Sequence, residues 1–413
     1  MLKNSMDQQK YAELSAWITA AGLAGKPETM MLSGFCDRLL AAGVPLGRGL
    51  VVIDTLHPVH EGRAFRWRAG PEKTELIEYG RTSEGEAAEN WRRNPFHRML
   101  QSGDAVLRLP LTAETVAEYS GLDQLHADGM TEYVAVVKRF AAGGIIGEMD
   151  CVYTGWATAE PGGFDDAAVA AITGLVPFLA LAIKCAALAR IAETLVGTYL
   201  GRDPARRVLS GRISRGVADR IATVLWFSDL RGYTGISDQA PPEQVIPLLN
   251  DYAGAIISTV HEGGGDVLKL IGDGVLAIFP AAEEERERAC RAALAAAVAA
   301  RRNVAALNRR RSAESLPVTD MYLGLHVGEV FYGNIGSEDR LDFTVIGPAV
   351  NEVSRIAAMC RSVDQPLLIS SAFAEAVGDE RKRLVSVGRY ALRGVGRPQE
   401  LFTLEPGTDG AGI

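Results

Sequence analysis

Two aspartates are placed where carboxylates could hold a metal ion. Asp229 ends the apolar segment 222–230, and Asp273 lies between Gly272 and Gly274. The apolar segment predicts a strand, and the glycine-flanked aspartate predicts the tip of a hairpin beside it in one sheet. Paired carboxylates at strand ends suit Mg²⁺, which takes one or two carboxylates and leaves positions for substrate phosphates. A single aspartate in a hairpin turn is usually only a turn residue, so the pair needs support from other motifs.

Four motifs occur in order and include both aspartates. They are FSDLRGYT (227–234), LKLIGDGVLAIFP (268–280), LHVGEVFYGNIGS (325–337) and DFTVIGPAVNEVSR (342–355). Together they resemble the catalytic domain of the class III nucleotide cyclases. The resemblance covers about residues 220–405, nearly half of the chain, and leaves the N-terminal half outside it.

The resemblance implies a role for each matching residue. Asp229 and Asp273 match the family's metal-binding aspartates, with the Leu230 carbonyl as an added contact, for two Mg²⁺ or Mn²⁺ ions per site. Asn351 and Arg355, four residues apart on one helix face, match the ribose-orienting Asn and the Arg that stabilises the transition state. The implied substrate-binding residues are Gly232, Tyr233 and Thr234 in a phosphate-binding turn, Arg393 at a position that often holds a phosphate-binding Lys, and the purine-reading Lys269 and Thr344.

The two purine-reading positions favour ATP over GTP. A lysine can donate to N1 of adenine, and a hydroxyl can accept from the 6-amino group. Guanine presents a donor at N1, and guanylate cyclases typically carry Glu where Lys269 stands. Thr344 also resembles a subgroup that bicarbonate stimulates, although one residue does not establish that trait.

Two positions depart from the family pattern. Tyr322 stands where many relatives carry a phosphate-binding Arg, which puts one triphosphate contact in doubt. Pro348 replaces an Asp or Lys of the turn before Asn351 and is expected to alter only that turn.

The family's sites lie between two catalytic domains in head-to-tail contact, whereas this chain has one such domain. The resemblance therefore implies a homodimer with two shared sites. The implied reaction is attack of the ribose 3′-oxygen of ATP on the α-phosphorus, which yields 3′,5′-cyclic AMP and pyrophosphate. Two alternatives remain: a guanylate cyclase, and a cyclase-like module that binds nucleotide or a partner without turnover.

The elements that must position these residues form a recognisable order. Apolar and periodic segments predict a strand at 222–230, a helix at 241–264, a hairpin at 266–280, a helix at 283–311 and a strand at 321–330. Further elements are expected at 340–347 and 349–359, followed by short strands. This β-α-β-β-α-β order predicts a ferredoxin-like α+β domain over residues 218–405, with a tail at 406–413.

Residues 1–176 predict a separate α+β module. Helices are expected within 1–45 and at 88–101 and 112–125; strands are expected at 48–56, 63–70, 132–140 and 146–158. The order resembles a GAF-like regulatory domain whose ligand is unknown. His57 and His60 could suggest a metal, but a structural role is the more common one for such a pair.

Residues 177–217 predict a signalling helix and a connector. Apolar residues follow heptad spacing at Phe178, Leu181, Cys185, Leu188, Ala192, Leu195 and Tyr199. This stripe could pair with the same helix of a second copy, or the helix could pack only on its own domain.

Composition bounds these interpretations. The 413 residues are 47% hydrophobic and 23% charged, with a net charge of −8, which excludes wholesale disorder and gives no global attraction to nucleic acid. The five cysteines form no CxxC pair, and the N-terminal sequence lacks a signal-peptide core, so a cytoplasmic protein is expected. Residues 167–183 carry no charge but include Gly174 and Pro177, and no membrane span is expected there.

Overall fold

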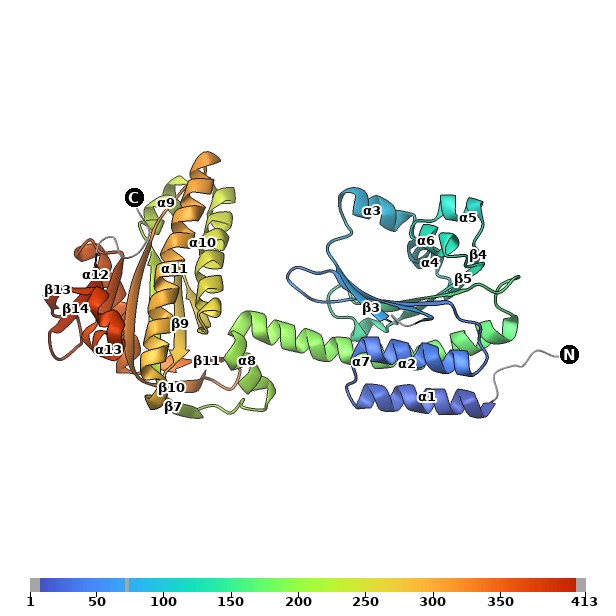
Figure 1. Cartoon of the computed structure of the whole chain (residues 1–413), viewed down its shortest axis with the longest axis horizontal. Coiled ribbons are helices and arrows are strands. Elements are labelled where there is room, and N and C mark those ends of the chain that lie inside the picture. Colours follow the sequence, from blue (N-terminus) through green and yellow to red (C-terminus); the bar gives the residue numbers. More distant parts are fainter. Residues whose placement is uncertain (1–7, 71–73, 406–413) are drawn as a thin grey trace. The chain divides into compact units, whose positions relative to one another are not determined.

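The computed structural model describes residues 8–70 and 74–405 (Figure 1). The chain divides into two compact units, Met1–Leu195 and Val196–Ile413, which are described separately below. The predicted tail at 406–413 lies outside the described residues.

The N-terminal unit contains a six-stranded sheet in the order β3-β2-β1-β6-β5-β4, antiparallel throughout. Strands β3 and β4 were not predicted, because they are edge strands with mostly solvent-facing residues and therefore a weak apolar signal. The strands are β1 (Arg48–Asp54), β2 (Gly62–Arg68), β3 (Thr74–Tyr79), β4 (Val106–Pro110), β5 (Glu132–Arg139) and β6 (Cys151–Thr158).

Helices cover both faces of this sheet (Figure 1). On one face lie α1 (Gln8–Leu23), α2 (Glu28–Ala41) and α7 (Asp166–Leu200); on the other lie α3 (Gly85–Arg92), α4 (Pro95–Ser102), α5 (Ala113–Glu118) and α6 (Asp123–Ala127). The single helix predicted at 88–101 is in fact two. The first ends at Arg92; Asn94 caps the second by accepting a hydrogen bond from the Phe96 amide, and Pro95 occupies its first helical position.

Helix α7 has one buried and one exposed face. Its buried residues run from Ala168 to Ile191 within the N-terminal unit, whereas Phe178 and Leu181 of the predicted heptad stripe are 38% and 61% exposed. By length and composition alone α7 could cross a membrane, and half of its most apolar window is buried inside the structure. The helix therefore packs on its own domain and still presents most of the stripe to solvent.

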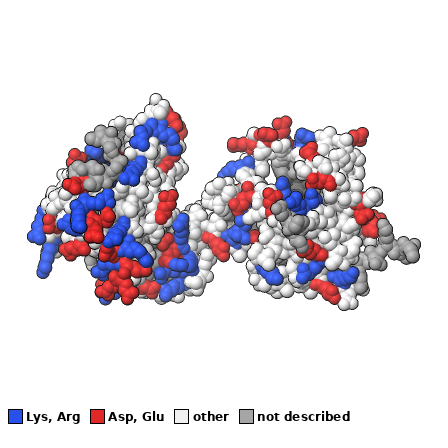
Figure 2. Space-filling model, viewed as in Figure 1, with Lys and Arg blue, Asp and Glu red and all other residues white. Residues whose placement is uncertain are grey.

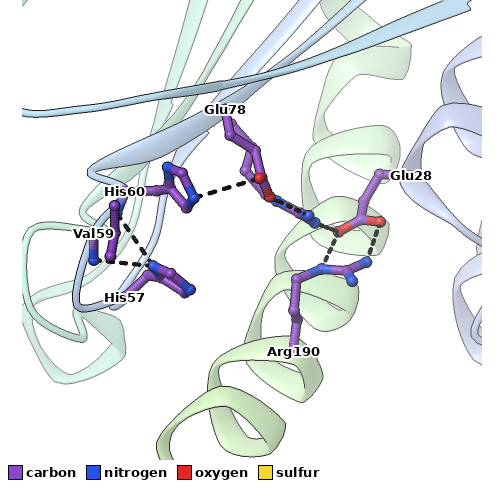
Figure 3. A network of polar contacts seen from close by, with 7 residues as sticks. Glu28, His57, Val59, His60, Glu78 and Arg190 are labelled. Carbon is purple, nitrogen blue, oxygen red and sulfur yellow. Dashed lines mark hydrogen bonds and ion pairs between the residues drawn. The ribbon is translucent and has the colours of Figure 1, made fainter. Parts of the chain in front are cut away.

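A buried carboxylate links α7 to the sheet (Figure 3). Glu28 accepts hydrogen bonds from Arg190 of α7 at 2.7 and 3.3 Å, and Arg63 of β2 lies 3.8 Å from it. Arg63 also pairs with Glu78 of β3, which lies 3.5 Å from His60. His57 accepts hydrogen bonds from the amides of Val59 and His60 through Nδ1, which is a structural role in the loop.

The C-terminal unit contains an eight-stranded sheet in the order β13-β14-β12-β10-β7-β9-β8, with β11 paired to β10. Its central order β10-β7-β9-β8 and the helices between these strands form the predicted ferredoxin-like arrangement, so the α+β fold class is confirmed. The strands are β7 (Ala218–Leu230), β8 (Asp266–Ile271), β9 (Gly274–Pro280), β10 (Met321–Gly336), β11 (Leu341–Ile346), β12 (Leu367–Ser370), β13 (Leu384–Tyr390) and β14 (Gln399–Leu404).

Helices α10 (Pro242–Glu262) and α11 (Arg286–Ala313) lie together over one face of this sheet (Figure 1) and bury its main core. Helix α12 (Pro348–Ser362) packs against β10 through a smaller core that includes Val353 and Val330. Gly324 of β10 permits this approach, because a Cβ there would lie 2.8 Å from the Val353 carbonyl oxygen. Two short helices were not predicted, α8 (Arg202–Leu209) and α9 (Tyr233–Gln239), and a third, α13 (Ser371–Ala376), follows β12.

Candidate functional site

The structure brings Asp229 and Asp273 together at one end of the sheet. Strand β9 pairs with β7 up to the partners Ser228 and Val275, which places the β8–β9 hairpin tip beside the end of β7. The Leu230 amide donates to Asp229 Oδ1 at 3.1 Å and to Asp273 Oδ2 at 3.2 Å. One backbone N–H therefore holds the two carboxylates side by side.

The glycines around Asp273 are required by this close approach. Gly272 has φ +63°, a conformation that other residues rarely adopt. A Cβ on Gly274 would lie 2.8 Å from the Ser228 carbonyl oxygen. A larger residue at position 274 would therefore push the hairpin tip away from β7.

The electrostatics of the pair suit a divalent cation. Burial and the neighbouring Asp273 carboxylate raise the pKa of Asp229 to about 6, because both disfavour its ionised form. Within residues 8–70 and 74–405, the ion pairs include none that joins Lys, Arg or His to either aspartate. Nor does the described part of the chain contain a cluster of three or more His, Cys, Asp or Glu placed to hold a metal. Two carboxylates with open positions fit Mg²⁺ or Mn²⁺, whose other ligands come from water or phosphate.

The turn that follows Asp229 is compact. Gly232 has φ +69° and precedes α9, which begins at Tyr233 and includes Thr234. Tyr322, one of the two departures from the family pattern, is the ladder partner of Asp229. The Arg231 guanidinium lies over the Tyr322 ring at 5.7 Å, so this tyrosine lies at the edge of the site.

Asn351 and Arg355 are both exposed and lie one turn apart on α12. No hydrogen bond or ion pair among the described residues joins either side chain to the two aspartates. The structure of one chain thus contains two separate polar groups, the carboxylate pair and the α12 pair. Arg393 is also exposed, in the segment between β13 and β14.

The two predicted base-reading residues have different surroundings. Thr344 is buried on β11, opposite Gly333 of β10. Lys269 of β8 forms an ion pair with Asp342, two residues before Thr344 and on the same side of β11. The sequence interpretation missed Asp342, because nothing in the sequence shows that β8 and β11 bring it to Lys269.

Comparison with known proteins finds similarity in the C-terminal part of the chain. The family described as the adenylate and guanylate cyclase catalytic domain matches residues 218–406. An uncharacterised protein of Mycobacterium tuberculosis is 33% identical over 208 residues, which cover 50% of this chain and 36% of that protein. An adenylate cyclase of Anabaena cylindrica is 33% identical over 164 residues, covering 39% of this chain and 32% of that enzyme.

The chain spans about a third of the length of these curated relatives. Among solved structures, the adenylyl cyclase CyaB from P. aeruginosa has a TM-score of 0.42 and 25% identity, covering 46% of this chain and 96% of that one. The guanylyl cyclase Cya2 has a TM-score of 0.40 and 30% identity, covering 46% of this chain and 97% of that one.

Proposed function

Because residues 218–406 form an adenylate and guanylate cyclase catalytic domain, we propose that the chain is an adenylate cyclase that converts ATP to 3′,5′-cyclic AMP and pyrophosphate. The observation that carries this proposal is the carboxylate pair Asp229 and Asp273, held together by one amide. An adenylate cyclase of Rhizobium meliloti, 30% identical over 188 residues, supports the assignment.

Asp229 and Asp273, with the Leu230 carbonyl, would hold two Mg²⁺ or Mn²⁺ ions. When bound, such ions lower the pKa of a coordinated hydroxyl and neutralise charge on phosphate oxygens. Burial and, after it, the Asp273 carboxylate raise the pKa of Asp229, and bound cations would oppose both effects. On this proposal the carboxylate pair binds the ions, and the ions in turn stabilise its ionised form.

The chain's other residues would bind and orient ATP. Backbone N–H groups of the turn at Gly232, Tyr233 and Thr234 would hold phosphate oxygens, and Arg393 would add a charge-assisted hydrogen bond. Asn351 would orient the ribose so that its 3′-oxygen lies in line with the α-phosphorus. Arg355 would stabilise the charge that develops on the transferring group.

The proposed site is shared between two copies of the chain. In one copy the α12 pair and the carboxylate pair have no direct link, so each copy would supply one half of each site. Exposed apolar side chains support this arrangement, because they lie on the strands that carry the site. These are Leu270 and Ile271 of β8, Phe331 of β10 and Ile346 of β11.

Base choice tests the proposal directly. Lys269 would donate to adenine N1 and Thr344 would accept from the 6-amino group, whereas GTP would set its N1 donor against the lysine. We expect a preference for ATP on the order of 10⁴-fold in kcat/KM. Lys269→Glu should sharply lower turnover of ATP. Equal kcat/KM values for ATP and GTP would favour a less selective cyclase, and no turnover of either would favour a nucleotide-binding module.

We also propose that residues 1–176 are a GAF-like regulatory domain and that residues 177–217 connect it to a cytoplasmic cyclase domain at 218–405.

The exposed stripe of α7 would pair with the α7 of the second copy. Cys185 tests this pairing, because it is exposed whereas the other four cysteines are buried. Mild oxidation should produce a disulfide-linked dimer that Cys185→Ser abolishes. A full-length chain that stays monomeric under active conditions would contradict both the α7 pairing and the shared site.

A further inference from the structure

We propose that Asp342 is the positioning residue for Lys269 and that this pair sets the preference of the site for adenine over guanine; the inference rests on the function proposed above. The structure shows the contact as an ion pair between Lys269 Nζ and Asp342 Oδ2. Asp342 opens the motif DFTVIGPAVNEVSR (342–355), but the resemblance assigned it no role.

The ion pair joins two strands that do not pair with each other. Strand β8 is hydrogen-bonded to β9, and β11 is hydrogen-bonded to β10. The backbone ladder therefore fixes the start of the lysine stem but not its ammonium end. Lysine has a flexible four-carbon stem and no preferred donor plane, so a side-chain partner must decide where the charge lies.

Asp342 leaves the lysine able to read a base. An ammonium group has three donors, and the carboxylate occupies one of them. The Lys269 and Asp342 side chains are 29% and 45% exposed, so the pair is open to solvent and to a ligand. A second donor can therefore point at the N1 acceptor of adenine while Asp342 holds the stem in place.

Asp342 also opposes the effect that the surroundings of Lys269 have on its pKa. Burial and the nearby Arg340 both lower the pKa of Lys269. A carboxylate in contact favours the charged form. Without Asp342, the lysine would lose its proton at lower pH, and its neutral amine could accept from the N1–H of guanine. The carboxylate thus keeps the donor that distinguishes the two purines.

The test uses the full chain with the variants Asp342→Asn, Asp342→Glu and the matched control Asp339→Asn. Asp339 is an exposed carboxylate in the same segment, so its variant removes an equal charge at a different place. The quantities to be measured are kcat and KM for ATP and GTP across the alkaline pH range, with thermal unfolding as a check of folding. Equilibrium binding of non-hydrolysable ATP and GTP analogues provides a readout that does not depend on turnover.

For Asp342→Asn we expect kcat/KM for ATP to fall about tenfold, mainly through KM, which is the size of one charge-assisted hydrogen bond. The ratio of kcat/KM for ATP to kcat/KM for GTP should fall by a similar factor. The loss of ATP turnover at alkaline pH should begin at a lower pH. Asp342→Glu should restore part of the ratio, and Asp339→Asn should behave like the native chain.

A folded Asp342→Asn variant with the native ATP-to-GTP ratio and the native pH profile would overturn the inference. The proposed function fails in a different way, through a native chain that neither forms cyclic AMP nor binds ATP in preference to GTP. A chain that binds ATP selectively without turnover would refute the enzyme and still test Asp342 through the binding ratio.

Discussion

In the N-terminal unit a buried carboxylate is surrounded by cations, whereas in the C-terminal unit two carboxylates lie side by side. Glu28, with a side chain only 4% exposed, contacts the guanidinium groups of Arg190 and Arg63. Asp229 and Asp273 share one amide donor, and burial together with the second carboxylate raises the pKa of Asp229 to about 6. The first cluster has its cations within the fold, whereas the second has none among the described residues and, on the proposed function, would bind metal ions.

The Glu28 network and the aspartate pair illustrate two roles of buried charge. In the first the charge stabilises the fold, and in the second it is proposed to bind a ligand. A buried ion is tolerated when partners satisfy it, and removing one partner leaves an uncompensated charge. Two like charges held close together lower the stability of the fold. Such pairs are found chiefly at functional sites, where a bound ligand offsets the repulsion. Mutations in the two clusters should therefore affect different measurements: stability for Glu28, and activity for the aspartates.

The largest expected effect is on activity. Asp273→Asn keeps the shape of the hairpin tip and its acceptor for the Leu230 amide but removes one of the two charges that would hold the metals. Several kcal/mol of transition-state stabilisation should be lost, which corresponds to a fall in cyclic AMP formation on the order of a thousandfold or more. The unfolding temperature without metal should not fall, since a like-charge repulsion is removed. Near-native activity in the folded variant would contradict the metal assignment.

The second prediction tests whether the two polar groups of the C-terminal unit meet across copies. Asp273→Ala and Arg355→Ala should each be inactive alone. After mixing and subunit exchange, half of the dimers are heterodimers with one intact site of two, so activity should return to about a quarter of the native value. No recovery, despite exchange shown by differently tagged chains, would place the complete site within one chain.

The sequence predicted the parts of the molecule that depend on local patterns. The β8–β9 hairpin follows from apolar runs around Gly272 and Gly274, and helices α10 and α11 follow from long periodic segments. The neighbouring positions of Asp229 and Asp273 could be inferred because β-α-β-β-α-β topology brings those strands together. Edge strands β3 and β4 were not predicted, because most of their residues face solvent and give no clear apolar pattern.

Contacts between distant segments could not be predicted. Glu28 and Arg190 are 162 residues apart, and Lys269 and Asp342 are 73 apart. Each pair depends on how whole elements pack, and a charged residue alone looks like an ordinary solvated side chain. Only the folded arrangement separates Asp342 from the exposed Asp339 three residues earlier.

The third prediction concerns stability in the N-terminal unit. Glu28→Gln leaves Arg190 and Arg63 without their buried carboxylate and should lower the free energy of unfolding by about 3 kcal/mol. Glu78→Gln, the matched control, removes a carboxylate that is 38% exposed and should cost about 1 kcal/mol or less. Denaturant unfolding followed by tryptophan fluorescence reports chiefly on this unit, because it contains four of the five tryptophans. Equal effects of the two variants would show that burial does not set Glu28 apart from the more exposed Glu78, which shares Arg63 with it.

The smallest expected effect is a pH dependence of stability caused by Asp54. This carboxylate of the N-terminal unit has acidic neighbours, so it resembles the aspartate pair more than it resembles Glu28. Burial raises the pKa of Asp54 to about 6, and its hydrogen bond from Tyr79 at 2.7 Å offsets only part of this. The unfolded value is about 3.9. Since the folded pKa is the higher one, Asp54 contributes stability that is fully present below about pH 4 and is lost as pH rises through 6.

The unfolding temperature of the N-terminal unit should therefore contain a component that falls from about pH 4 to pH 6. Asp54→Asn should remove this component while keeping an acceptor for the Tyr79 hydroxyl. Asp128 is the matched control of opposite sign: Arg48 lowers its pKa, so its contribution is lost as pH falls, and Asp128→Asn should leave the decline between pH 4 and 6 in place. A native pH profile in Asp54→Asn would mean that the fold satisfies this carboxylate as fully as it satisfies Glu28, and Asp54 would then offer no N-terminal counterpart to the aspartate pair of the C-terminal unit.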